Sequence, residues 1–382
     1  MKHLILIFFC VLTFLLLSFR VTKVPPGING DEVGIGRNVY LISKNLTDEN
    51  NNFLPLFIFA KSSDWKQPVT VYTTALMFRI FGTSLEVLRA TSILFVLVSI
   101  VIFYLFSKEI YTSRFFAVGT VILVTMPIIM IQSHLAMENI AVLPFILFWL
   151  WQLPKRPFIA GGGLGVGLFS YLGMRAIVPV LVFISLFYFR KNMKKVVNFL
   201  LGVSPFFILL YIASFHYPGA VVGHFNAPIP SINEFLLRYL SVFDLSFLFL
   251  KGDVTPYHST GNAGMFLIST LPIFLFGIWE ILKRKKSFEI LILTSFFLTP
   301  LLFGFVPDIY RASRILALVP FYTIISTIGF FALSTKLRVA ILVLIAVNYL
   351  FFVKDYWFNY PDRVKDNFPY TLENYNYDFT KK

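Results

Sequence analysis

The sequence predicts an all-α polytopic membrane protein, and three observations lead to this fold class. Hydrophobic residues make up 57% of the 382 residues and charged residues only 14%, which is more apolar surface than a soluble chain of this length could bury. Apolar runs of roughly 17–25 residues recur, the length that a helix needs to cross about 30 Å of hydrocarbon. A helix satisfies its own backbone hydrogen bonds in lipid, so these runs are expected to be helical.

About eleven transmembrane helices follow from these runs. The first run is treated as a retained helix, because the following "SFRVTKVPPG" contains no small-residue cleavage site of a signal peptide. The fourth, fifth and sixth runs are short, and we expect them to tilt or to pack irregularly. The predicted spans are 3–20, 85–106, 115–132, 139–153, 158–173, 176–189, 196–215, 264–282, 289–306, 315–334 and 338–353.

Basic residues assign the ends of these spans to the two sides of the membrane. Lys2 and one set of short turns (107–114, 153–157, 189–195, 282–288 and 334–338) carry fifteen Lys and Arg residues, whereas the short turns of the other set carry only Arg175, Arg311 and Arg314. The positive-inside rule makes the first set cytoplasmic. The net charge of +14 therefore reflects topology, and no nucleic-acid partner is expected.

The polar chemistry is predicted on the opposite, extracytoplasmic face. Sixteen of the nineteen acids lie there. This face holds a long first loop (21–84), a second loop (216–263) and a short tail (354–382), while 1–353 forms the transmembrane domain. In the first loop, helical spacing of apolar residues predicts two amphipathic helices, 31–46 and 66–82, lying on the outer surface. Asp31 and Glu32 begin the first helix, where acids are electrostatically favourable even without a function.

Isolated charges at the outer ends of the spans are expected to converge on one cavity. Each could alone be an interfacial residue with its charge in water, but their number on one face favours a shared site that also includes Asp31 and Lys66. The polar segment 249–266 contributes two further candidates, Asp253 and His258. Possible metal ligands occur singly or in incomplete sets along the sequence, so no metal site is indicated. The end-of-span charges are Glu138, Arg175, Arg311 and Arg314.

An ordered set of segments resembles the GT-C glycosyltransferases, in particular the branch of protein O-mannosyltransferases and aminoarabinose lipid A transferases. It begins with "NGDEVGIGRNVYLIS" (29–43) and "DWKQPVTVYTTALMFRIFG" (64–82), the latter similar to a Lys-Pro-Pro segment of that family. Further segments are "SHLAMENIAVLPFILF" (133–148), "GLFSYLGMRAIVPVLVF" (167–183), "FLKGDVTPYHSTGNAG" (249–264) and "IYRASRILALVPF" (309–321). The sequence departs from the family pattern at Gln67, Trp65 and Gly34, with Arg37 one helical turn after Gly34.

The resemblance implies a transferase that takes a sugar from a polyprenyl-phosphate carrier, without a metal or other cofactor being indicated. It implies that Asp31, of the Asp31–Glu32 pair, is the general base and that Lys66 binds the lipid phosphate. Arg175, Arg311 and Arg314 suit a departing phosphate. Arg37, Glu138, Asp253 and His258 are weaker substrate-binding candidates.

The residues are consistent with this chemistry, and two other function classes stay open. A carrier-linked sugar suits a site outside the cell membrane, and direct attack by an acceptor hydroxyl, deprotonated by a carboxylate, would invert the anomeric carbon. A transporter or flippase would more often place charges at mid-membrane in repeated halves. A carrier-lipid polymerase or ligase would more naturally use an Arg-rich outer loop. The sugar, the acceptor (protein, glycan or lipid), the carrier length and the oligomeric state are not encoded in any motif.

Overall fold

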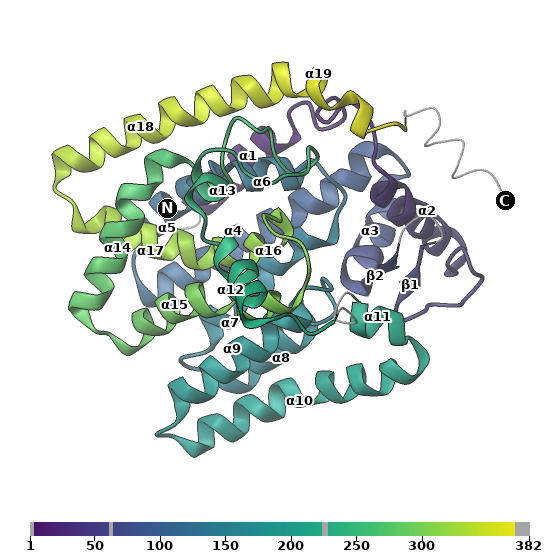
Figure 1. Ribbon diagram of the computed structural model, residues 1–382, viewed down its shortest axis with the longest axis horizontal. Coiled ribbons are helices and arrows are strands. Elements are labelled where there is room, and N and C mark those ends of the chain that lie inside the picture. Colours follow the sequence, from purple (N-terminus) through teal and green to yellow (C-terminus); the bar gives the residue numbers. More distant parts are fainter. Residues whose placement is uncertain (1–3, 61–63, 224–227, 371–382) are drawn as a thin grey trace.

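A computed structural model describes residues 4–60, 64–223 and 228–370 of the chain. Helices form nearly all of its regular structure, arranged as an elongated bundle with α10 along one edge and α18 along the opposite edge (Figure 1). The described part contains one two-stranded antiparallel sheet, β1 (Ile58–Phe59) with β2 (Trp65–Lys66). This confirms the predicted all-α membrane fold class.

Each of the eleven predicted spans coincides with helical structure, although not every one is a single long helix. Five described segments are long and apolar enough to cross a membrane, and a bent pair would make a sixth. The remaining ranges contain shorter apolar helices, so the count of eleven stays a prediction. The corresponding helices are α1 (Leu4–Ser18), α4 (Leu85–Ile110), α5 (Ser113–Val124) with α6 (Pro127–Ser133), η1 (Glu138–Ala141) with α7 (Val142–Gln152), α8 (Pro157–Gly167), α9 (Met174–Phe189), α10 (Met193–His216), η3 (Ile268–Thr270) with α14 (Leu271–Arg284), α15 (Ser287–Leu298) with η4 (Leu301–Phe305), α16 (Ala312–Ile315) with η5 (Leu316–Leu318) and α17 (Val319–Ala332), and α18 (Thr335–Lys354).

The bundle separates a buried centre from lipid-facing edges. The segment Ala312–Ala332 is 89% buried inside the protein, whereas the apolar windows of α10 and of the segment beginning at Thr335 are each only 22% buried. Apolar side chains left exposed on such long helices are expected where lipid is the solvent. The central position of Ala312–Ala332 places the chain just before it, which carries Arg311, close to the middle of the bundle.

A break interrupts the predicted span 115–132. Between α5 and α6 the chain bends by 67°. Met126 has an extended backbone with ψ of 127°, because a residue that precedes a proline is pushed out of the helical region. Pro127 then begins α6. The predicted continuous helix was therefore wrong in this detail, and the bend directs the chain toward Gln132 and Glu138.

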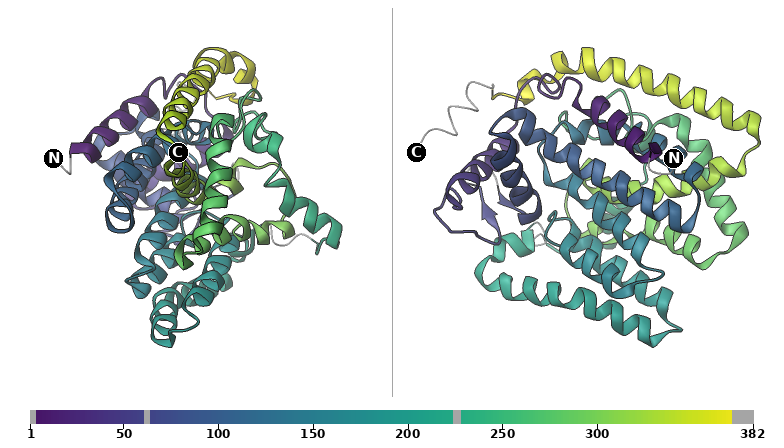
Figure 2. Two further views of the ribbon diagram at one scale, coloured as in Figure 1. Left: turned by 90° about the vertical axis from the view of Figure 1, so that its left-hand side faces the viewer. Right: turned by 180° about the vertical axis from the view of Figure 1, so that it is seen from behind.

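The first loop folds as a compact unit at one end of the bundle (Figures 1 and 2). Both predicted helices are confirmed, as α2 (Gly30–Asn45) and α3 (Pro68–Phe81). Their apolar faces pack together through Ile35, Val39, Val71 and Phe78. The hairpin of β1 and β2, which the sequence did not predict, carries the chain back from α2 toward α3.

The second loop and the tail are also partly helical. The second loop contains α11 (Pro218–Val222), α12 (Ile232–Ser241) and α13 (Leu245–Phe249). The predicted tail continues from α18 through η6 (Asp355–Asn359), α19 (Tyr360–Val364) and η7 (Lys365–Asn367). Its last predicted part, 371–382, lies outside the described residues.

Glycines let α8 and α10 approach each other closely. A side chain on Gly161 would collide with the carbonyl oxygen of Phe199, and one on Gly202 would collide with that of Phe158. This confirms that "GGGLGVG" (161–167) serves helix packing, as the position of the motif within a spanning segment indicates. A Cβ on the neighbouring Gly162 would meet nothing nearer than 3.9 Å.

We expect Gly161→Ala to destabilise the protein by about 1–3 kcal/mol, because the added methyl group forces two backbones apart. Gly162→Ala is the matched control and should leave stability unchanged or slightly raised, since alanine favours helix. Thermal unfolding of both variants in the same detergent checks this. Equal shifts for the two substitutions would contradict the packing assignment.

Candidate functional site

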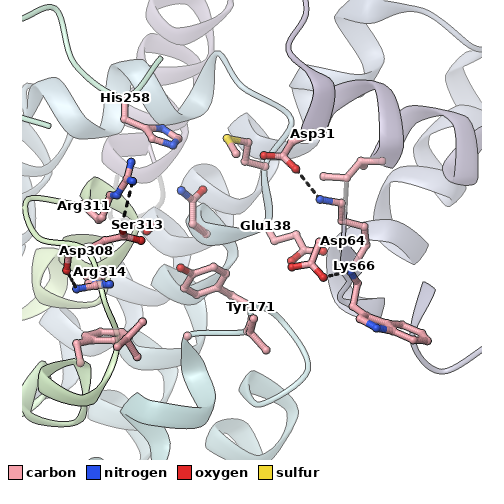
Figure 3. A pocket seen from close by; sticks show the side chains of 18 residues that line it. Asp31, Asp64, Lys66, Glu138, Tyr171, His258, Asp308, Arg311, Ser313 and Arg314 are labelled. Atoms are coloured by element: carbon pink, nitrogen blue, oxygen red, sulfur yellow. Dashed lines mark hydrogen bonds and ion pairs between the residues drawn. The ribbon is translucent and has the colours of Figure 1, made fainter. Parts of the chain in front are cut away.

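A cavity of about 310 Å³ collects six of the ten predicted site residues: Asp31, Lys66, Glu138, His258, Arg311 and Arg314. They come from segments far apart in the sequence, namely the start of α2, the strand β2, the start of η1, the second loop and the region around α16. Figure 3 shows Asp31, Glu138 and Lys66 on one side of the cavity and the two arginines with His258 on the other. The predicted convergence of charged side chains is therefore present for five residues, all except Arg175, and the separately predicted candidate His258 joins them.

On the first side, Asp31 and Lys66 form an ion pair, with 2.8 Å between Oδ1 and Nζ. A capping box fixes the start of α2, because the Asn29 side chain accepts from the Glu32 backbone N–H and the Glu32 carboxylate accepts from that of Asn29. Asp31 thus stands in the first turn of a helix whose start is rigidly held. Its side chain is 43% exposed, whereas that of Lys66 is nearly buried.

Glu138 lies beneath this ion pair, just before the predicted span 139–153. Its carboxylate accepts a hydrogen bond from the backbone N–H of Gln67, so it holds the residue that follows Lys66. Burial raises the pKa of Glu138 to about 7, although the positive charge of Lys66 opposes this rise. Both protonation states of Glu138 are therefore accessible at neutral pH.

On the second side, His258 is a neutral hydrogen-bond acceptor toward the protein. Gln132 Nε2 lies 2.9 Å from His258 Nδ1, and an amide nitrogen can only donate. Burial lowers the pKa of His258 below its ordinary value, and the nearby Arg311 adds to this, while Asp253 and Asp31 act in the opposite direction. With Nδ1 accepting, the neutral ring carries its proton on Nε2.

The two arginines of this side differ in how firmly they are held. Arg314 is 6% exposed and donates to the carbonyl oxygens of Pro307 and Asp308. Arg311 makes a looser ion pair with Asp308, 3.6 Å between nitrogen and oxygen. Arg311 is thus the guanidinium with more freedom to turn toward a bound anion, whereas Arg314 fixes the loop that presents it.

Four predicted residues do not line this cavity. Arg37 pairs with Glu49 at 3.4 Å. Asp253 accepts hydrogen bonds from Thr255 and from the Ala312 backbone N–H, so it connects the second loop to α16. The other two, Glu32 and Arg175, are buried behind the cavity wall.

Glu32 lies at the centre of a buried network with Arg89. The guanidinium of Arg89 donates to both carboxylate oxygens at 2.9 and 3.1 Å, and both side chains are fully buried. Arg89 also donates to the carbonyl oxygens of Val21 and Gly27, while Glu32 accepts from the Ala136 backbone N–H at 3.0 Å. The pair thereby joins the start of the first loop to α4 and to the turn before Glu138.

Arg175 supports the first side from behind. Its guanidinium donates to the side-chain oxygen of Gln67 at 2.6 Å and to the carbonyl oxygens of Ala220 and Val221. It therefore holds α11 against the segment that carries Lys66. Gln67 is in this way fixed through both its backbone and its side chain.

The sequence alone did not single out several residues that line the cavity, among them Asp64, Tyr171 and Asp308. Asp64 and Asp308 each lie within three residues of a predicted cation, which was an available signal. Tyr171 offered none, because one tyrosine in an apolar segment is normal for such a chain. Within the described ranges, no group of three or more His, Cys, Asp or Glu side chains is arranged to hold a metal ion.

Comparison with solved structures identifies the fold. The chain is similar to ArnT from Cupriavidus metallidurans bound to undecaprenyl phosphate, with 15% identity and a TM-score of 0.61 over 89% of this chain and 62% of that one. It is also similar to the archaeal oligosaccharyltransferase AglB from Archaeoglobus fulgidus, in complex with an inhibitory peptide and a dolichol-phosphate, with 14% identity and a TM-score of 0.53 over 95% and 55% of the two chains.

The chain therefore shares the fold of these two structures, which is the GT-C type of fold that the sequence resemblance predicted. It spans less than two thirds of the length of either of these structures. No protein-family model matches the chain, and no curated protein sequence matches it.

The two adjacent acids should differ sharply in their effect on stability. We expect Glu32→Gln to destabilise the protein by about 3 kcal/mol, because it leaves the buried charge of Arg89 without its partner. Asp31→Asn should cost about 1 kcal/mol or less, since its ion pair is half-exposed. Thermal and denaturant unfolding measure both, and a Glu32→Gln variant as stable as the wild type would contradict the structural role of this pair.

Proposed function

We propose that the protein is an integral membrane glycosyltransferase that moves a sugar from a polyprenyl-phosphate carrier to an acceptor hydroxyl on the extracytoplasmic side of the cell membrane. The observation that carries the proposal is the cavity itself, in which the Asp31–Lys66 ion pair faces Arg311 and Arg314. A carboxylate and several cations around one space of sugar size suit the transfer of a glycosyl group away from a phosphate. The GT-C fold and the carrier phosphates named for ArnT and AglB support the same class of donor.

The reaction requires one bond to form and one to break at the anomeric carbon. The acceptor oxygen bonds to this carbon while the bond from the carbon to the phosphate oxygen breaks, and the bonding electrons leave with the phosphate. The proton of the acceptor hydroxyl passes to a carboxylate, for which we propose Asp31. Attack from the side opposite to the phosphate inverts the configuration.

Lys66 and Arg311 are the proposed partners of the departing phosphate. Among the described residues, Asp31 is the only side chain that forms a hydrogen bond or ion pair with the ammonium group of Lys66. The ion pair of Arg311 in the same part of the chain is the loose one with Asp308. Lys66 and Arg311 can each release the carboxylate partner and bind the phosphate in its place. The planar guanidinium of Arg311 suits a bidentate contact with a phosphate. When Lys66 turns to the phosphate, the carboxylate of Asp31 becomes available to the acceptor.

The remaining predicted residues are proposed to support these groups. Glu32, Arg175 and Arg314 make hydrogen bonds to loop backbone, so their contribution is to hold Asp31, Lys66 and Arg311 in place. Glu138 is a second carboxylate in the cavity, and its raised pKa makes it the alternative proton acceptor. His258 can donate from Nε2 to a sugar hydroxyl.

The proposed location of the cavity on the extracytoplasmic side is based on the distribution of basic residues. The turns that carry the large excess of Lys and Arg are at the ends of the spans opposite to the first loop, and such turns stay in the cytoplasm. The donor must then have crossed the membrane already, which a lipid-linked sugar can do and a nucleotide sugar cannot.

We expect Asp31→Asn to lower sugar transfer by about a thousandfold, within the range that general-base removal produces. The measurement is transfer from a panel of polyprenyl-phosphate sugars in membranes that contain equal amounts of each variant. Asp244→Asn is the control, because Asp244 caps α13 by accepting from the Phe247 backbone N–H and asparagine caps equally well.

Wild-type transfer by Asp31→Asn would contradict the assignment of the base. Movement of the intact carrier lipid across the membrane, with no sugar joined to an acceptor, would instead indicate a flippase.

A further inference from the structure

The chain that follows α18 crosses the end of the bundle and contacts both loops that supply the cavity. This C-terminal segment (Asp355–Tyr370) contains η6, α19 and η7 and ends beside α2 (Figure 1). Several of its side chains are buried, among them Tyr356, Tyr360, Val364 and Phe368. These four side chains anchor the segment to the elements that it crosses, although its residues do not line the cavity.

Its first contacts hold the loop of His258 on both sides of that residue. The hydroxyl of Tyr360 donates to the carbonyl oxygen of Pro256 at 2.8 Å, and Arg363 donates to that of Thr260 at 3.1 Å. Pro256 and Thr260 are each two residues from His258. Two hydrogen bonds from one short helix thus fix the backbone that presents the imidazole.

An ion pair within the segment orients the arginine. The guanidinium of Arg363 makes a bidentate pair with Asp355, at 2.8 and 2.6 Å. The same carboxylate accepts from the side chain of Asn262, at 3.4 Å to the nearer oxygen. Because a bidentate pair restricts the guanidinium plane, Arg363 is pre-oriented toward Thr260.

Its last contacts hold the start of the loop that carries Asp31. Ile28 and Tyr370 exchange two backbone hydrogen bonds, of 3.0 and 3.4 Å. A side chain on Gly27 would collide with the carbonyl oxygen of Phe368, so the two backbones are in close contact there. Asp31 follows Ile28 by three residues.

We propose that the C-terminal segment positions the two sides of the cavity relative to each other, with Tyr360 and Arg363 as positioning residues that act through the loop of His258. One packed segment connects the backbone on either side of His258 with the backbone just before Asp31. The separation of these two side chains then depends on this segment as well as on the membrane helices. A glycosyl transfer is sensitive to such a separation, since a misplacement of about 1 Å can cost a hundredfold in rate.

Two tyrosines of the segment provide a matched pair of variants. Tyr360→Phe removes only the hydroxyl that donates to Pro256, while the ring stays in place. Tyr356→Phe is the control, because Tyr356 is equally buried, lies one helical turn earlier, and its hydroxyl has no hydrogen-bond partner among the described residues. Any general effect of a Tyr-to-Phe change in this segment would appear in both.

The first readout is amide hydrogen exchange of the full-length protein in detergent, which does not require any activity. We expect Tyr360→Phe to raise exchange about fivefold in 256–260, the effect of one lost hydrogen bond, and to raise it also in 27–31, where the Ile28 amide bonds to Tyr370. Tyr356→Phe should change neither region. Unchanged exchange in 27–31, with or without a change in 256–260, would overturn the proposal.

The second readout rests on the proposed function. In the transfer assay, Tyr360→Phe is expected to lower kcat per folded protein about tenfold. The affinity for undecaprenyl phosphate alone should stay unchanged, because Lys66 and Arg311 are untouched. Arg363→Gln should behave in the same way, and Arg363→Lys, which keeps the charge beside Asp355, should restore part of the rate. If the loss of transfer activity is explained entirely by a smaller folded fraction of the variant, the positioning role is overturned. If no donor supports transfer by the wild type, the proposed function fails while the exchange result still decides the role of the segment.

Discussion

The buried ion pair of Glu32 and Arg89 is the interaction on which the rest of the site depends. Charges of this kind are stable out of water only when every oxygen and N–H group is matched, and here the carboxylate oxygens accept from Arg89, Asn29 and Ala136. One pair thereby ties the loop before α2, the helix α4 and the turn before Glu138 into one rigid unit. Asp31 and Glu138, which adjoin this unit, both line the cavity.

Adjacent acids serve different purposes because a helix turns about 100° at each residue. Glu32 points into the protein, where it caps α2 and pairs with Arg89, whereas Asp31 points into the cavity toward Lys66. The same division recurs among the cations. Arg314 is engaged by loop carbonyl oxygens, and Arg311 is left with a loose pair. In each pair, one side chain has fixed partners and supports the site, while the other can change its partner.

The sequence predicted the fold class, both helices of the first loop and the convergence of five charged residues, because apolar run length, helical spacing and charges at the ends of spans are local signals. Local signals could not show that Glu32 and Arg175 support the site from behind, whereas Asp31 and Arg311 line the cavity. The partners that bury them are far away along the chain, Arg89 for Glu32 and Gln67 for Arg175. Arg89 itself stands within an apolar run. The contacts of Tyr370 with Ile28 also required the folded structure, as did the bend at Pro127.

The ion pair between Asp31 and Lys66 makes the proposed binding of the carrier phosphate by Lys66 directly measurable. If Lys66 binds the carrier phosphate, Asp31 competes with the phosphate for the same ammonium group. The measurement is the affinity of purified wild type, Asp31→Asn and Lys66→Met for undecaprenyl phosphate in nanodiscs. We expect Asp31→Asn to bind undecaprenyl phosphate more tightly than the wild type and Lys66→Met to bind it more weakly by about tenfold or more. Equal affinities for all three proteins would contradict it.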